Sequence, residues 1–501
     1  MIGNVLELWR IVATATGKMQ QIYRPGLPKF VRAGWPAIFA AIAAFAPVGC
    51  LERPTTIDAP PPRPFAGAVL TVAVADPSDR DLARLLGRSW AARNGAEVRI
   101  SETPFDGTAD VALIPPADLP KWADAGRLGE VPAERRDPAD PYRWDDVLRP
   151  YAVRLTTWGD RTYALPVLGE GMVLVYRKDA FDGKDGRPAG PPATWDELAA
   201  VAPKLGLPPL PATADRLQAE FFTAAAAYDR PAVGRLGASD MLREREAFFA
   251  FQFDPKTGDP RLGTPAFVHV ADLFRQMQSH RSRQPDVGAA FRTGEAKVGV
   301  LTLAELGRIG PDTAEGLGVA PLPGARFTFD SAGNRRPTDR ELVNRVPYLG
   351  WGGRLGVVSA SCANPAAAWN LLADAGMPDR GALELLADTR WGAGPYRTSQ
   401  LEARSRGRWY GYGLTATETE RLTTALGENV GLGIENYRIR LRTPNRADLD
   451  AALDAALRAL LTDQAMKPAD AMTKANADWK AIIDRQPRDA WQKVARKSLG
   501  F

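Results

Sequence analysis

The chain has 501 residues, of which 45% are hydrophobic and 25% are charged, a composition typical of a globular protein with two or three domains. Its formal net charge is +5, and +4 of this lies in residues 1–49, which contain five Lys or Arg residues and one acid. A nucleic-acid-binding protein needs a basic face to neutralise phosphates, so the near-neutral remainder of the chain argues against that class.

The N-terminal segment has the layout of a secretory signal. Residues 33–49 carry no charge, follow the basic residues Lys29 and Arg32, and end at Gly49 before Cys50. Seventeen residues that include two prolines span a bilayer poorly, although a short membrane anchor or a buried helix remains the alternative. We predict a signal peptide at 1–49, and its long basic region suggests that translation starts at Met19.

The residues around the predicted cleavage site point to a lipid anchor. The sequence "PVGC" (47–50) resembles a lipobox, in which the cysteine becomes the lipid-modified first residue of the mature protein, although Pro47 stands where Leu is usual. The following stretch includes "APPPRP", and Pro-rich chain adopts an extended, semi-rigid conformation. We therefore predict that 50–66 is a lipid-anchored, Pro-rich linker attached at Cys50.

The folded part begins with alternating strand and helix patterns. "AVLTVAVAD" (68–76), "AEVRI" (96–100) and "ADVALIP" (109–115) are β-rich, and 77–95 is amphipathic with Ser78 as its expected cap. This rhythm predicts parallel strands in an α/β sheet. The later patterns predict strands within 162–181, 296–302 and 354–360, helices at 194–205 and 364–376, and a helical C-terminal segment over about the last 60 residues.

The sequence offers no recognisable reaction centre. It lacks a nucleophile elbow, a P-loop, an H-E-x-x-H motif and a CxxC pair, and its two histidines, His269 and His280, form no metal pattern. Cys362 is expected to be a small core or loop residue. Adjacent acids on a helix point apart, so the acidic pairs of this chain are expected to be solvated helix starts. We predict no cofactor, no metal and no enzymatic activity.

Five segments of the sequence together carry a resemblance. "LPVLGEGMVLVYRKDAF", "PPATWDELAAVAPKL", "FRTGEAKVGVLT", "GVAPLPG" and "NPAAAWNLLADAG" occur in an order and at separations that resemble the maltose-binding-like solute-binding proteins of ABC importers. The resemblance runs from about residue 67 to 490. It implies a two-lobed, hinge-linked α/β periplasmic-binding-protein fold of type II, with lobe 1 at 67–165 and 347–385 and lobe 2 at 166–346 and 386–495.

The resemblance and the strand ends together suggest ligand-binding residues. Glu170 matches in spacing a hinge glutamate that hydrogen-bonds sugar in maltose-binding relatives, although it could be a solvated turn residue. Asp76 and Ser78 follow the first strand, where open α/β sheets bind ligands, and Ser78 could serve only as a cap. Trp351 and Gly352 follow the expected return across the hinge, with further candidates at Trp391 and Tyr396. Any of these aromatic residues could instead belong to the core.

Two aromatic positions of the maltose binders are absent. Ile114 stands at one of them and Ala304 at the other, and Ala117-Asp118 aligns with the Asp-Arg pair of those relatives. Sugar sites use flat aromatic faces as apolar platforms, so the loss of two platforms leaves the solute class open. Asp118 completes the set of expected ligand-binding residues.

The resemblance implies a membrane-tethered binding protein that captures a small polar solute, such as a carbohydrate, and delivers it to the permease of an ABC transporter. The protein would act as a monomer in the periplasm or at the cell surface, without nucleic acid as a partner. Two alternatives stay open. The same fold could serve a sensor without transport, and a secreted hydrolase would need catalytic residues that the sequence does not display.

The tether is directly testable. Replacing Cys50 by Ser should abolish incorporation of labelled fatty acid and leave the precursor unprocessed by lipoprotein signal peptidase, because the thiol is the site of lipid attachment. The matched control is Cys362→Ser, which should leave labelling unchanged. Labelling that persists in the Cys50 variant would contradict the prediction.

Overall fold

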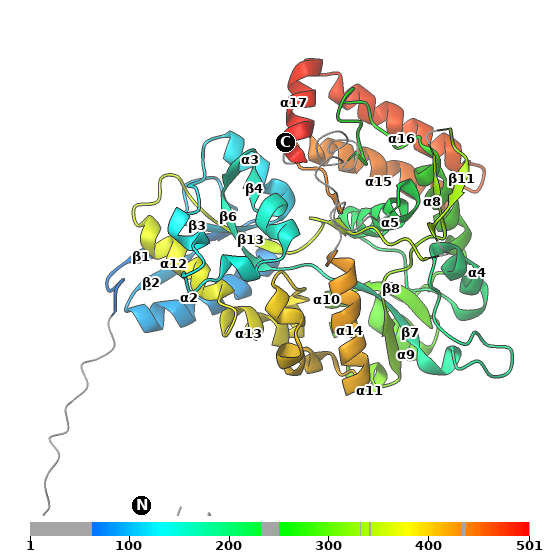
Figure 1. The fold of residues 1–501 in the computed structure, drawn as a ribbon, viewed down its shortest axis with the longest axis horizontal. Helices are drawn as coiled ribbons and strands as arrows, with labels where there is room; N and C mark the ends of the chain where they lie inside the picture. The colour runs from blue at the N-terminus through cyan, green and yellow to red at the C-terminus, as the bar shows by residue number, and fades with distance from the viewer. Residues whose placement is uncertain (1–62, 232–249, 331, 340–341, 433–436, 500–501) are drawn as a thin grey trace, which may run out of the picture. The chain divides into compact units, whose positions relative to one another are not determined.

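Two separate β-sheets organise the chain (Figure 1). The computed structural model describes residues 63–231, 250–330, 332–339, 342–432 and 437–499. The predicted signal peptide, Cys50 and most of the predicted linker lie outside these residues. Among the described residues, no helix is both long and apolar enough to cross a membrane.

The first sheet has five strands in the order β2-β1-β3-β13-β6. The strands are β1 (Val69–Val74), β2 (Glu97–Ile100), β3 (Val111–Ile114), β6 (Ala164–Leu168) and β13 (Arg354–Val358). As the strand-helix-strand rhythm predicted, β1 pairs in parallel with both β2 and β3. β13 arrives from the later part of the chain and pairs antiparallel with β3 and β6, so the complete sheet is mixed. Two helices, α2 (Arg80–Asn94) and α12 (Pro365–Gly376), pack against this sheet and against each other.

The second sheet is antiparallel and has the order β8-β7-β9. The central strand β7 (Met172–Arg177) pairs with β8 (Val298–Thr302) and β9 (Leu317–Ala320). The sequence pattern over 162–181 predicted one strand, whereas the structure divides it into β6 and β7, which belong to different sheets. The predicted boundary between the lobes at 165/166 falls within β6, which continues to Leu168 in the five-stranded sheet.

Helix α14 packs against the antiparallel sheet, while α15 and α16 of the C-terminal part pack against α5 and α8 (Figure 1). The helical C-terminal segment was predicted, and three helices, α15, α16 and α17, make it up. The longer helices of this region are α4 (Trp195–Leu205), α5 (Ala214–Asp229), α8 (Pro265–Gln278), α14 (Ala416–Asn429), α15 (Arg446–Thr462), α16 (Pro468–Ile483) and α17 (Arg488–Ser498).

The shorter elements connect these layers. Short helices are α3 (Leu119–Asp124), α9 (Val287–Thr293), α10 (Leu303–Gly307), α11 (Pro311–Ala314) and α13 (Gly381–Ala387). Short strands are β4 (Thr157–Trp158), β5 (Arg161–Thr162), β10 (Phe327–Phe329), β11 (Arg335–Pro337), β12 (Tyr348–Leu349) and β14 (Arg438–Ile439). β12, which the predicted boundaries place in lobe 1, pairs with β14, which they place in lobe 2.

Helix starts show where local sequence decides the structure. The predicted start of α4 at Thr194 is confirmed, because the Thr194 hydroxyl accepts from the Glu197 N–H at 3.1 Å while the Glu197 carboxylate accepts from the Thr194 N–H. The predicted Ser78 cap of α2 is wrong. Residues Pro77–Asp79 form a 3₁₀ turn, and Asp79 occupies the N-cap position without a capping side-chain bond. The Asp79 carboxylate instead binds Arg354 of β13.

Three short segments meet where the chain passes between the sheets, and we call them the junction segments. Residues 169–171 join β6 to β7, residues 350–353 lead from β12 into β13, and residues 392–395 lie against the first. The Gly394 N–H donates to the Gly169 carbonyl at 2.9 Å. A Cβ at Gly394 would lie 2.0 Å from the Glu170 carbonyl oxygen, so only glycine permits this approach.

The close contact at Gly394 predicts a large cost for a single methyl group. Gly394→Ala should lower the free energy of unfolding by at least about 2 kcal/mol, since overpacking against backbone forces the junction segments apart. Gly407→Ala is the matched control, because a Cβ there meets nothing within 4 Å. Chemical denaturation of both variants measures the difference. Equal stabilities would show that the junction segments can separate at no cost.

Candidate functional site

A cavity of about 530 Å³ borders both sheets. Its walls come from residues of 209–216 before and within α5, of 285–287 at the start of α9, and of 302–308 at the end of β8 and in α10. Trp351 and Arg354 complete it from the junction segment 350–353 and the start of β13. Ligand pockets of proteins typically have volumes of about 300–1,000 Å³, so this cavity has the size of a small-molecule site.

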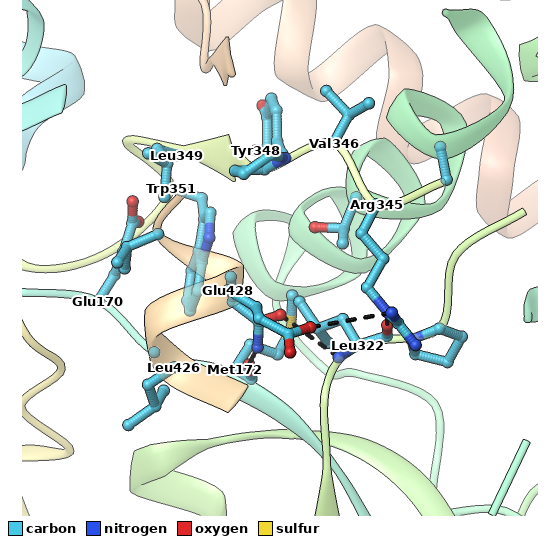
Figure 2. Close-up of a pocket in the computed structure, with 17 residues that line it drawn as sticks. Glu170, Met172, Leu322, Arg345, Val346, Tyr348, Leu349, Trp351, Leu426 and Glu428 are labelled. Atoms are coloured by element: carbon cyan, nitrogen blue, oxygen red, sulfur yellow. Dashed lines mark hydrogen bonds and ion pairs between the residues drawn. The ribbon is translucent and has the colours of Figure 1, made fainter. Parts of the chain in front are cut away.

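Trp351 is the only aromatic residue among the described residues that line this cavity. Its side chain is half-buried, and it also lines a second, much smaller cavity of about 30 Å³. Figure 2 shows the indole in that smaller cavity, with Glu170 on one side and Leu426 and Glu428 of α14 close to its other end. Trp351 thus lines both cavities.

Arg354, at the start of β13 in the five-stranded sheet, contributes a positively charged side chain to the cavity wall. Its guanidinium binds the carboxylate of Asp79 and lies 3.8 Å from that of Asp76. Burial raises the pKa of Asp79, and the neighbouring Arg354 partly offsets this effect. Asp76 was predicted as a ligand-binding residue, and the structure places it beside the cavity through Arg354, although Asp76 itself is not a lining residue.

The opposite wall contains a second set of paired charges. The Arg216 guanidinium binds the carboxylates of Glu305 at 3.1 Å and Glu220 at 2.9 Å. Glu305 also completes a capping box with Thr302 at the start of α10. Arg440 binds Asp215, another lining residue, at 2.6 Å. These pairs fix guanidinium and carboxylate groups in place, where they can donate to and accept from the hydroxyl groups of a solute.

Glu170 does not face the large cavity. Its side chain lines the smaller one and is 3% exposed, and its two carboxylate oxygens accept from the N–H groups of Gly350 at 2.6 Å and Gly352 at 2.7 Å. The Glu170 N–H donates to the Tyr151 hydroxyl at 2.9 Å. Burial raises the pKa of Glu170 to about 8, against the opposing effect of the backbone N–H groups. The Glu170 carboxylate therefore contacts the turn that carries Trp351, and it does not line the large cavity.

The remaining predicted ligand residues lie away from the large cavity. Tyr396 is 1% exposed and packs against Tyr151 and Arg397 in the core, and it is not among the residues that line the large cavity. Trp391 lies half-buried in the turn Thr389–Trp391 beside α10 and is not a lining residue. Gly352 contributes its backbone N–H to Glu170. The backbone of Ser78 lies in the turn after β1, and Cys50 lies outside the described residues.

Asp118 has a partner in the C-terminal helices. Its carboxylate binds Arg446 of α15 at 2.7 Å, and it lies at the start of α3. At the other end of α3, the Asp124 carboxylate binds Lys497 of α17 at 2.6 Å. Both ends of this short helix are thus bound by cations from the C-terminal segment, and Asp118 does not line the cavity.

The two positions where maltose binders have aromatic residues have different environments. Ile114 is fully buried in β3, whereas Ala304 lines the cavity in α10. The polar lining residues that were missed from the sequence include Arg216, Thr302, Glu305 and Arg354. One signal could have found two of them, since Thr302 ends a predicted strand and Glu305 follows three residues later, which is a capping-box spacing at a strand end.

The described residues include no group of three or more His, Cys, Asp or Glu side chains that could hold a metal ion. The arrangement instead offers one aromatic face, guanidinium groups, carboxylates and the Thr302 side chain around one cavity. Such a set can bind a polar solute through hydrogen bonds and one apolar surface.

Comparison with solved structures confirms the predicted fold class, a two-lobed periplasmic-binding-protein fold. The cyclic alpha-maltosyl-1,6-maltose binding protein from Arthrobacter globiformis is 18% identical, with 84% of this chain and 100% of that chain covered and a TM-score of 0.57. An ABC transporter solute-binding protein from Agrobacterium radiobacter, in complex with ribitol, is 16% identical, with 83% and 99% covered and a TM-score of 0.59. The sugar-binding protein MalE from Xanthomonas citri is 16% identical, with 83% and 98% covered and a TM-score of 0.58.

Among curated protein sequences, none matches this chain. A family model described as bacterial extracellular solute-binding protein does match, over residues 97–373. The match covers more than half of the chain. It includes β2, β3, the junction segments 169–171 and 350–353, and most of the cavity wall. The chain therefore belongs to the family of bacterial extracellular solute-binding proteins.

Proposed function

We propose that this protein captures a small polyhydroxylated solute, a carbohydrate or a related polyol, in the 530 Å³ cavity and delivers it to the permease of an ABC transporter. The observation that carries the proposal is the position of the cavity. Trp351 and Arg354 come from the junction segment 350–353 and the first sheet, while Thr302 and Glu305 come from the end of the second sheet. A solute in this cavity would contact both predicted lobes.

The chemistry of the lining supports a solute with many hydroxyl groups. The Trp351 indole offers an apolar face to the carbon skeleton of a sugar ring, while the fixed charged pairs around Arg216 and Arg354 can donate to and accept from hydroxyl groups. One of the solved structures with this fold is in complex with ribitol, which is a solute of this kind. Ala304 stands where maltose binders have an aromatic residue, and Trp351 is the one aromatic platform among the described lining residues, which favours a short solute over a long oligosaccharide.

Solute capture would act by shifting a conformational equilibrium. A ligand that contacts both lobes stabilises only the closed form, so its binding moves the population toward closure, and a permease can detect occupancy as a change of shape. In this proposal lobe 1 comprises 67–165 and 347–385, lobe 2 comprises 166–346 and 386–495, and the junction segments act as the hinge.

The family is extracellular, which places the protein in the periplasm or at the cell surface. We further propose that a lipid on Cys50 tethers it to the membrane and that the Pro-rich linker separates the folded part from the lipid surface. The protein would act as a monomer there, since a tethered binding protein can meet the permease by diffusion along the membrane.

A thermal-shift screen against sugars and polyols tests the proposed function, followed by calorimetry with the solute that stabilises the protein. A solute at about 100 times its Kd should stabilise the fold by roughly 2.7 kcal/mol. Trp351→Ala should then weaken binding at least tenfold, or about 1.4 kcal/mol, because the apolar face is lost. Trp122→Ala, in α3 and outside the cavity lining, is the matched control. Equal affinities of the two variants would place the site elsewhere.

The proposed binding function also predicts that the protein releases its solute chemically unchanged. When the protein is incubated with its solute, nuclear magnetic resonance spectra of the solute should stay constant over many hours, because no catalytic set was recognised in the sequence. Steady product formation that scales with protein concentration would favour the alternative of a secreted hydrolase.

A further inference from the structure

The turn that carries Trp351 has little to hold it in place by itself. Gly350 has a φ of 87° and Gly353 a φ of 75°, so left-handed glycines bracket the residue pair Trp351-Gly352. Glycine adopts many backbone conformations at low cost, and a glycine-rich turn therefore needs outside contacts to select one of them. The position of the indole depends on what binds the backbone of this turn.

The Glu170 side chain supplies that contact from a segment 180 residues earlier in the chain. Its carboxylate oxygens accept the N–H of Gly350 on one side of Trp351 and that of Gly352 on the other, and the Trp351 N–H also favours the ionised carboxylate. Figure 2 shows Glu170 beside the Trp351 indole. Both bonds are short and charge-assisted when the carboxylate is ionised, which is the stronger class of hydrogen bond.

The surroundings of Glu170 fix it from several elements. The Tyr151 hydroxyl accepts the Glu170 N–H, and the Arg440 N–H donates to the Leu349 carbonyl just before the turn. The titratable or charged groups around the carboxylate are Tyr151, Tyr348 of β12 and Arg440, while Arg345 and Glu428 line the same small cavity. Among them Arg440 favours the ionised form of Glu170.

Ionisation decides how many N–H groups Glu170 can satisfy. A carboxylate accepts at both oxygens, whereas a protonated carboxyl group presents a hydroxyl donor at one of them and so loses an acceptor for one backbone N–H. Burial raises the pKa of Glu170 to about 8, so the group changes its charge close to neutral pH. Protonation should therefore release one of the two bonds to the turn.

We propose that Glu170 is a positioning residue, which acts through the Gly350–Gly352 turn to set the position of the Trp351 indole between the solute cavity and the smaller cavity, and whose ionisation tightens that turn. One consequence of this inference rests on the proposed function: the Glu170 carboxylate changes the affinity for solute without contacting the solute. The arrangement of the turn itself is a property of the solute-free protein.

The test follows the indole directly. The purified full chain is labelled with fluorotryptophan, and the fluorine resonance of Trp351 is assigned by its loss in Trp351→Phe. In solute-free protein this resonance should shift with pH, with a midpoint near 8. Glu170→Gln should remove the shift. The matched control is Glu428→Gln, which changes a carboxylate in the same small cavity that makes no bond to the turn, and the shift should persist.

Three outcomes would overturn the proposal. These are a wild-type Trp351 resonance that does not change between about pH 6 and about pH 10, an unaltered shift in Glu170→Gln, and a shift that disappears equally in Glu428→Gln. If Glu170→Gln fails to fold, Tyr151→Phe provides the second variant. It removes the hydroxyl that binds the Glu170 backbone, so it should move the midpoint of the shift, and an unchanged midpoint counts against the proposal.

Solute binding gives a separate readout. Glu170→Gln should weaken binding of the solute found by the thermal-shift screen about tenfold at pH 9, where wild-type Glu170 is ionised, and by less at pH 6. A purely structural role would lower affinity equally at both pH values and would contradict the proposal. If no sugar or polyol binds wild-type protein, the proposed function fails, while the resonance of Trp351 still decides the role of Glu170.

Discussion

The Glu170 carboxylate, with its two backbone N–H donors, is the interaction on which the arrangement around the cavity depends. It joins the segment that leaves the five-stranded sheet to the segment that returns to it, and it does so with a buried carboxyl group. Burying a carboxylate is costly, and the two N–H groups offset only part of that cost. Glu170, which was predicted to bind solute, therefore holds the turn that carries Trp351 beside the large cavity.

Charged side chains around the cavity are likewise bound by oppositely charged partners. Arg354 is bound by Asp79, Arg216 by Glu305 and Glu220, and Arg440 by Asp215 and Asp450, so the polar groups are held by partners before any solute arrives. Groups that are already oriented lose less entropy when they bind a ligand. Elsewhere, cations of α15 and α17 bind both ends of α3, which ties the C-terminal helices to the first part of the chain.

Local patterns predicted much of the fold, and the failures have physical reasons. The strands β1 and β3 were found because they are nearly continuous apolar runs, as is typical of buried strands. Helix α5 was not assigned, since every residue from Leu217 to Asp229 is buried and no polar face marks its period. β6 and β7 were not divided, although Gly169-Glu170-Gly171 interrupts the apolar run, because the change of sheet depends on pairing with the distant strands β13 and β8.

The sequence by itself determined the secondary structure with strong local signals, the α/β class and the family resemblance. These depend on residues close together in the chain, such as the Thr194–Glu197 capping box. Only the tertiary structure decided which candidates reach the cavity. Trp351 lines it and Tyr396 lies in the core, although both are aromatic residues near predicted crossings. The partners of Glu170, Arg354 and Asp118 lie 180, 275 and 328 residues away, and no local pattern encodes contacts at such separations.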